Sequence, residues 1–263
     1  SIGQAEIIKG PASSIYGAGT GGVINFQLQR APYQGQSLEL TSLAGAYGLK
    51  RLATNYRGGG DLLNSYVSYG WQEYEGYRAH SKDMRTFLTA NFQLFPSHKR
   101  MITLMLNRTN QDSQIPGSLT RAQAIDDPKQ ANAGNLDKKA ARYQNWTRIG
   151  VGQQYHFNDR LTNNTSLFTY FYDLDHPLPY AYLRNTYQSY GGRTRFSYDV
   201  GFPILPTRFI VGAEYNEGLT KGTQYANVQG KEGVLNGNID YNNTQYSLFY
   251  QSETNLAPKT LLT

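Results

Sequence analysis

Residues Gly17, Gly19 and Gly22 have the spacing of a dinucleotide-binding loop, which makes them the first candidates for chemistry in this chain. In such a loop the glycines lead into a helix whose N-terminus holds the pyrophosphate. Here they are followed by Val-Ile-Asn-Phe at 23–26, which is typical of a strand. The pattern therefore favours a backbone role for these glycines, in a tight turn or a close approach, over nucleotide binding.

A second candidate is the cluster of Asp173, Asp175 and His176, because carboxylates and imidazoles are metal-binding groups. The cluster flanks the end of a strand-like segment, where a solvated loop stem would account for the same residues. The other histidines, at 80, 98 and 156, are scattered without a partner at ligand spacing. We therefore predict no metal site.

Catalytic residues form no ordinary pattern in this sequence. The chain has no cysteine, which excludes a thiolate metal site, a cysteine nucleophile and a disulfide framework. The pair Ser13-Ser14 lacks the G-x-S-x-G elbow of hydrolases. The net charge of +6 is spread along the chain with no basic run, so it does not indicate nucleic-acid binding. The sequence predicts no enzyme activity and no cofactor.

The composition indicates strands as the elements that position the side chains. The 263 residues include 22 Tyr, 11 Phe and 27 Gly, and the aromatic share of 13% is too high for a disordered chain. No run approaches the roughly 18 to 20 consecutive apolar residues of a membrane helix. Any crossing of a membrane would therefore be made by strands.

From residue 33 onward the chain alternates two kinds of side chain with a period of two, in segments of about ten residues bounded by turn residues. In segment 63–73, Val67 and Trp71 fall on one face, and Ser68 and Gln72 fall on the other. Later segments repeat the alternation. The polar face includes Arg85, Arg148, Gln154, Arg193, Arg195 and Glu214. One face suits lipid and the other suits water.

This periodicity predicts about ten strands, which is close to half the wall of a plugged outer-membrane transporter of ~22 strands. We place them at 37–45, 49–57, 63–73, 83–95, 100–109, 147–157, 161–173, 187–200, 207–217 and 242–254. A soluble antiparallel sandwich also alternates apolar and polar residues. Aromatic residues near segment ends, alternating short and long links, and charges in the middle of the polar face favour a transmembrane β-barrel.

The segment from Ala5 to Gln27 resembles the end of the plug domain of TonB-dependent outer-membrane receptors. Members of that family carry a strand, then Gly-Pro, Ser-x-x-Tyr-Gly and Gly-Gly-Val-Ile-Asn. The matching residues here are Gly10, Pro11, Ser13 or Ser14, Tyr16, Gly17, Gly21, Gly22, Val23, Ile24 and Asn25. We expect these glycines to pack the plug against the wall, where an added Cβ would clash.

The resemblance implies an all-β chain in two parts. Residues 1–32 would be the C-terminal end of a plug domain and a linker, and residues 33–263 would be the N-terminal half of an antiparallel outer-membrane β-barrel. The sequence would then be a fragment of a longer protein, which fits the absence of a signal peptide.

In function, the resemblance implies active uptake of a ferric siderophore across the outer membrane of a Gram-negative bacterium. The siderophore would be a transported ligand and not a cofactor. The TonB energy-coupling complex would act through a segment that precedes Ser1, and outer-membrane lipid would surround the barrel. No nucleic-acid partner is expected.

The longest expected loop runs from Asn110 to Asn145, well beyond the ~12 to 15 residues at which a structureless loop needs an explanation. Its Pro-Gly-x-Leu-Thr run at 116–120 and Asp-Pro pair at 127–128 resemble the corresponding loop of ferric-citrate and related siderophore receptors. An anionic chelate would be held at the mouth by Arg, Lys, Tyr and Gln side chains. The candidates are Tyr74, Tyr77, Arg78, Arg121, Arg142, Tyr180, Tyr182 and Arg184.

Three alternatives stay open at this point. A plugged receptor for cobalamin, an oligosaccharide or another metal chelate would keep the fold and change the cargo. A porin or adhesin barrel would lack the plug pattern of Ala5 to Gln27. A soluble binding module would fold cooperatively without detergent.

Overall fold

The structure is a computed structural model, and it describes residues 2–9, 21–28, 34–201, 205–257 and 260–263. A small antiparallel sheet joins β1 (Ile2–Lys9) to β2 (Gly22–Leu28). Of the predicted plug pattern, Gly21, Gly22 and Asn25 are described, and Gly10, Pro11, Tyr16 and Gly17 lie outside the described residues.

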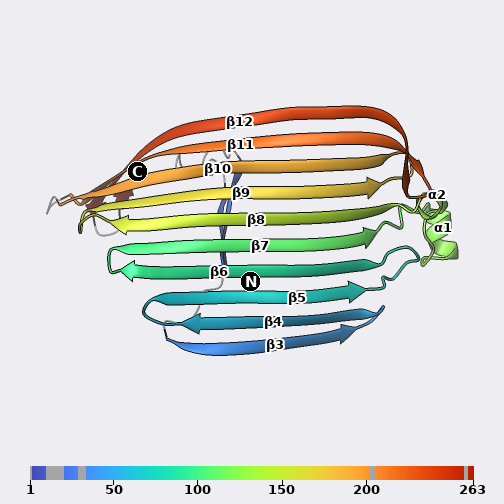
Figure 1. The fold of residues 1–263 in the computed structure, drawn as a ribbon, viewed down its shortest axis with the longest axis horizontal. Coiled ribbons are helices and arrows are strands. Elements are labelled where there is room, and N and C mark those ends of the chain that lie inside the picture. The colour runs from blue at the N-terminus through green and yellow to red at the C-terminus, as the bar shows by residue number, and fades with distance from the viewer. Residues whose placement is uncertain (1, 10–20, 29–33, 202–204, 258–259) are drawn as a thin grey trace.

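All the other strands form one antiparallel sheet of 11 strands, in which each strand pairs with the strands next to it in sequence (Figure 1). They are β3 (Gly35–Gly45), β4 (Leu49–Gly59), β5 (Leu63–Tyr74), β6 (Asp83–Ser97), β7 (Arg100–Gln114), β8 (Ala141–His156), β9 (Leu161–Pro177), β10 (Tyr182–Val200), β11 (Thr207–Val228), β12 (Lys231–Ala257) and β13 (Thr260–Leu262). The ten predicted strands correspond to β3–β12. Over the described residues the sheet is open, with β3 and β13 at its edges.

The two faces of the sheet follow from the cross-strand register, because directly paired residues point to the same side. Arg51 pairs with Gln72, and Gln72 pairs with Arg85, so these three share a face. Phe26 of β2 lines a cavity together with residues of that face. We call it the inner face, and the opposite one the outer face.

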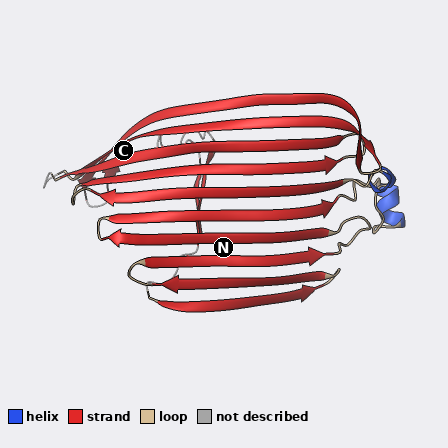
Figure 2. Ribbon diagram, viewed as in Figure 1, coloured by secondary structure: helices blue, strands red, loops and turns tan. Residues whose placement is uncertain are grey.

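Apolar side chains on the outer face have no covering layer in the described chain. Leu248 is 88% exposed, Tyr246 77% and Leu167 63%. Figure 2 shows one large layer of strands with short helices at one end and only the small β1–β2 sheet beside it, so the described chain does not form the alternative of a two-sheet sandwich. Such an extended uncovered apolar face needs a lipid or protein environment. We call the end with the helices the helix end.

Three phenylalanine rings on the inner face lie over glycines directly opposite them on the neighbouring strand. The pairs are Gly70 with Phe87, Gly191 with Phe168, and Gly212 with Phe249. A Cβ added at Gly70 would lie 2.3 Å from the ring of Phe87, closer than real contacts allow. These glycines therefore let the rings lie against the sheet, an aromatic–glycine pairing that helps fix strand register.

The predicted boundaries were wrong at the helix end. The predicted loop from Asn110 to Asn145 is shorter, because β7 continues to Gln114 and β8 begins at Ala141. Strands β9–β12 also continue beyond their predicted ends, and their connections at 178–181 and 229–230 are short. Long links therefore do not alternate regularly with short ones. The backbone ladder persists where apolar residues are scattered among Gly, Asn and charged residues, and there the periodicity that marks a strand in sequence fades.

The glycines of the plug pattern meet the sequence expectation only in part. Among the described residues, an added Cβ at Gly21 has no atom within 4 Å, so the expected clash is not found there. Gly22 has a φ of 122°, which L-residues rarely adopt, so its need for glycine has a backbone cause.

The helices of the described chain are α1 (Arg121–Asp126) and α2 (Ala133–Asp137), both in the connection between β7 and β8. Neither has the length and apolar character needed to cross a membrane.

Candidate functional site

Residues 115–140 form a structured cap at the helix end of the sheet, and we call this segment the loop cap. Its first helix begins with a capping box, in which Thr120 accepts a hydrogen bond from the Gln123 backbone and Gln123 accepts one from the Thr120 backbone. Asn132 caps the second helix by accepting hydrogen bonds from the amides of Gly134 and Asn135. The cap is therefore built from short helices with satisfied N-termini.

Arg78, in the connection between β5 and β6, ties that connection to the loop cap. Its guanidinium donates to three backbone carbonyls of the cap, with distances of 2.7 Å to Gly117, 2.9 Å to Gln130 and 3.3 Å to Pro116. The neighbouring His80 Nε2 lies 2.7 Å from the carbonyl oxygen of Ala140. Arg78 was predicted as a ligand residue, but here its donors hold the cap.

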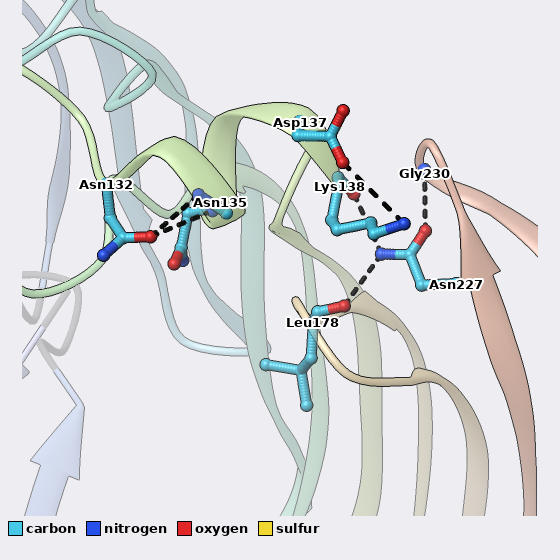
Figure 3. A network of polar contacts seen from close by, with 8 residues as sticks. Asn132, Asn135, Asp137, Lys138, Leu178, Asn227 and Gly230 are labelled. Carbon is cyan, nitrogen blue, oxygen red and sulfur yellow. Dashed lines mark hydrogen bonds and ion pairs between the residues drawn. The ribbon is translucent and has the colours of Figure 1, made fainter.

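Asn227 is a second residue that ties the cap to the sheet, as Figure 3 shows. Its side-chain amide donates to the carbonyls of Lys138 and Leu178, each at 2.8 Å, and its oxygen accepts from the Gly230 amide at 2.7 Å. Asn227 is 8% exposed. One buried side chain thus joins the loop cap to the turns that follow β9 and β11.

Below the cap, a chain of hydrogen bonds crosses the inner face from β9 to β6. Arg142 donates to the hydroxyl of Tyr172, which donates to Gln144. Gln144 then donates to Gln111, and Gln111 donates to Asp83 at 2.8 Å. These linked hydrogen bonds order the side chains along the wall.

The predicted candidates Arg184 and Tyr182 do not point to the inner face. The Arg184 guanidinium pairs with Asp175 at 2.7 Å and with Glu232 at 2.5 Å. The register pairs Arg184 with Asp175 on the outer side of the sheet. Tyr182 is 8% exposed. These residues join β9, β10 and β12 at the helix end.

The remaining candidates lie around the helix end. Arg142 starts the hydrogen-bonded chain described above, and Tyr74 ends β5 on the inner face. Tyr77 packs edge-on against Tyr47, with ring centroids 5.2 Å apart. Arg121 and Tyr180 are exposed. The structure does not gather the predicted candidates into one pocket.

The possible metal cluster is separated by the strand geometry. Asp173 and Asp175 point to the outer side of β9, and His176 points to the inner side, because the side-chain period is two. Burial, and then the nearby charge of Arg142, lower the pKa of His176 below its ordinary value. No group of three or more His, Cys, Asp or Glu positioned to hold a metal occurs among the described residues.

A cavity on the inner face lies between β2 and the wall of β3–β8. Its volume is about 810 Å³, within the range of ligand pockets. Arg51, Arg85 and Arg148 line it, and no Asp or Glu does. The guanidinium carbons of Arg51 and Arg85 lie 5.7 and 5.8 Å from the centroid of Phe87, the ring that covers Gly70. We call this cavity the inner-wall cavity.

Sequence reasoning assigned Arg85 and Arg148 to the polar face but did not propose them as binding residues. The signal was present in the alternation: arginine recurs in the middle of the water-facing side of several strands. Their convergence depends on the register between strands β4 to β8, which a single sequence does not specify.

Solved structures with a similar fold are siderophore receptors. The ferric citrate transporter FecA in its unliganded form matches 96% of this chain and 40% of its own, with a TM-score of 0.80 and 16% identity. The siderophore receptor PiuA from Acinetobacter baumannii matches 99% of this chain and 46% of its own, with a TM-score of 0.76 and 14% identity. The pyoverdine receptor FpvA from Pseudomonas aeruginosa PAO1, bound to pyoverdine, matches 98% of this chain and 44% of its own, with a TM-score of 0.78 and 13% identity.

No protein-family model matches the chain. The structural matches show that the chain has the fold of the plug end and adjoining barrel wall of TonB-dependent outer-membrane receptors, as its sequence resemblance predicts. It spans less than half the length of these three receptors.

Proposed function

We propose that this chain is part of an outer-membrane receptor that takes up a ferric siderophore with energy from a TonB-type coupling complex. The observation that carries the proposal is the combination of two sheets, an open barrel wall of 11 strands and the small β1–β2 sheet on its inner side. Receptors for ferric citrate, pyoverdine and another siderophore share this fold over 96–99% of the chain.

The two faces of the sheet support an outer-membrane location. The outer face presents Leu167, Val211 and Leu248 without cover, as a lipid-facing barrel wall requires. The inner face carries arginines and amides, as a water-filled lumen requires. In this arrangement the helix end, with the loop cap, faces the outside of the cell, because the longer connections of such barrels are extracellular.

The residues that would bind the cargo remain proposals. The sequence candidates Arg121, Arg142 and Tyr180 lie at the helix end, where an approaching chelate would arrive. The fold is common to receptors for chemically different siderophores, so it supports the class of cargo and no single compound.

Deletion of the reading frame in its own host tests the proposal. Under iron limitation, the deletion strain should lose growth on at least one ferric siderophore, and the complete gene should restore it. A protonophore or loss of the coupling protein should abolish the restored growth. If no ferric siderophore in a broad panel distinguishes the strains, while binding of cobalamin or an oligosaccharide does, the cargo assignment is wrong and the fold assignment stands.

A further inference from the structure

We infer that the inner-wall cavity is a binding site for a small polyanion, with Arg51, Arg85 and Arg148 as its cationic groups. This inference deepens the proposed function, on which it rests, by giving the transported chelate a net negative charge. It also places a contact on the barrel wall, below the loop residues that the sequence suggested.

The three cations have no carboxylate partner among the residues that the structure describes. The inner-face carboxylates closest in register are committed elsewhere. Asp83 accepts hydrogen bonds from Gln111 and Ser113, and Glu39 pairs with Arg57 at 3.2 Å. The charge of the cavity is therefore not neutralised by its own wall.

Arg51 and Arg85 share the ring of Phe87 in spite of their like charges. They lie on one cross-strand row, separated only by Gln72, and both guanidinium carbons lie within 5.8 Å of the Phe87 ring centroid. Cation–π contact offsets part of the repulsion. A carboxylate or phenolate placed between two guanidinium groups would gain charge-assisted hydrogen bonds from both.

The third cation and the floor of the cavity are also ordered before any ligand arrives. Arg148 lies with its guanidinium carbon 5.0 Å from the ring centroid of Tyr170. On the floor, the Asn107 amide donates to Thr89 at 2.9 Å, so its donors are used within the wall. The charged donors in the cavity belong to the arginines, and they favour an anion over a neutral polar molecule.

The experiment uses the complete protein that contains this chain, purified in detergent, with the tricarboxylate tricarballylate as the probe. Its uncharged analogue, propane-1,2,3-tricarboxamide, is the chemical control. Phenylglyoxal modifies accessible arginines, and peptide mass analysis reports each site separately. We expect tricarballylate to slow modification of Arg51, Arg85 and Arg148 at least fivefold, and the amide to have no effect. Arg160, in the turn between β8 and β9, is the internal control and should be unaffected by either compound.

Substitution provides a second, independent measurement. The double variant Arg51→Gln/Arg85→Gln should bind tricarballylate at least tenfold more weakly by calorimetry, whereas Arg160→Gln removes a charge at the other end of the sheet and should leave binding unchanged. A heat-modifiable gel shift verifies folding of each variant. Because the protection assay uses the unaltered protein, the inference stays testable if a variant fails to fold.

Two results would overturn the inference. One is equal protection of Arg160 and the cavity arginines, and the other is failure of phenylglyoxal to react with the cavity arginines even without anion, which would show that an acidic group of the protein already fills the site. Growth assays separate the two proposals. If tricarballylate protects the cavity arginines but growth does not depend on a siderophore, the site is supported and the uptake function is rejected. If growth depends on a siderophore but the arginines are not protected, the uptake function is supported and the site is rejected.

Discussion

The arginines of the loop cap and those of the inner-wall cavity show two different uses of the same side chain. Arg78 donates hydrogen bonds to three backbone carbonyls. It therefore fixes the position of the cap and has few N–H groups left to bind a ligand. Arg51 and Arg85 instead stack on Phe87 and have no carboxylate partner among the described residues. Structural arginines are distinguished from candidates for binding by the contacts of each guanidinium. The position of the residue near the barrel mouth is a poorer guide.

The largest expected effect is the loss of Arg78. Arg78→Ala leaves three carbonyls without their donors, and hydrogen bonds to charged groups contribute about 1.5 to 3 kcal/mol each. Allowing for solvent, we expect local opening of the loop cap to become easier by about 3 kcal/mol. Hydrogen exchange of residues 116–132 measures this change. Arg121→Ala, in the same cap, is the matched control, and equal exchange in both variants would refute the structural role of Arg78.

Loss of Asn227 should have a smaller effect with the same sign. Asn227→Ala removes two donated bonds and one accepted bond at a buried position, for which we expect about 2 kcal/mol of local stability. Asn227→Asp keeps the oxygen that accepts from Gly230 but places a carboxylate against two carbonyls. Asn227→Asp should therefore lower the local stability at least as much as Asn227→Ala. Exchange at 138–140 and 229–230 reports the result, and a milder Asp variant would contradict these contacts.

The glycine under Phe87 gives a test of the inner wall itself. Gly70→Ala places a methyl group against the ring and should cost about 1 to 2 kcal/mol, as overpacking does. The ring would also move, which displaces Arg51 and Arg85. Gly152→Ala is the control, because its nearest neighbour would be Thr103 at an ordinary 3.8 Å. Urea unfolding of the complete protein in detergent compares them, and equal stability would show that the ring does not occupy this place.

The smallest effect concerns the exposed ion pair of Lys82 and Glu73 beside the cap. The hydrogen bond with Lys82 lowers the pKa of Glu73, and the same bond raises the pKa of Lys82. Stability from Glu73 is present above its unfolded pKa and is lost as the pH falls through the lowered value. Stability from Lys82 is lost as the pH rises through the raised value.

The pair should therefore contribute between these limits. A Glu73→Gln variant should release the connection 75–82 to protease faster than the parent protein near pH 7. That difference should disappear in strong acid, and a constant difference at every pH would rule out the ion pair as its cause.

The sequence predicted the strands and their faces well because a period of two is a local property. The placement of Val67 on the outer face and of Ser68 on the inner face can be read from one segment. It could not predict the length of β11 and β12, since their distal parts mix scattered apolar residues such as Leu235 and Ile239 with Gly, Asn and Lys. It also missed the inner-wall cavity, because Arg51, Arg85 and Arg148 converge only through the register of several strands.

The partners of the loop candidates could not be predicted for a related reason. Residue type and closeness to an expected loop suggest Arg78 and Arg184 as candidates, and neither property reveals the partner of a side chain. The three carbonyls that bind Arg78 come from positions 116–130, about forty to fifty residues away. Long-range contacts of this kind are not encoded in the local pattern.

The central claim is that the outer face meets lipid and the inner face meets water, and cysteine substitution tests it most directly. The chain has no native cysteine, so each introduced thiol is unique within it. In the complete protein in lipid vesicles, a fluorophore on Leu248→Cys or Leu167→Cys should be quenched by nitroxide lipids, and one on the adjacent Ser247→Cys or Ser166→Cys should be quenched by a water-soluble agent. Lipid quenching at all four positions, or at the serine positions alone, would contradict the assignment of the two faces.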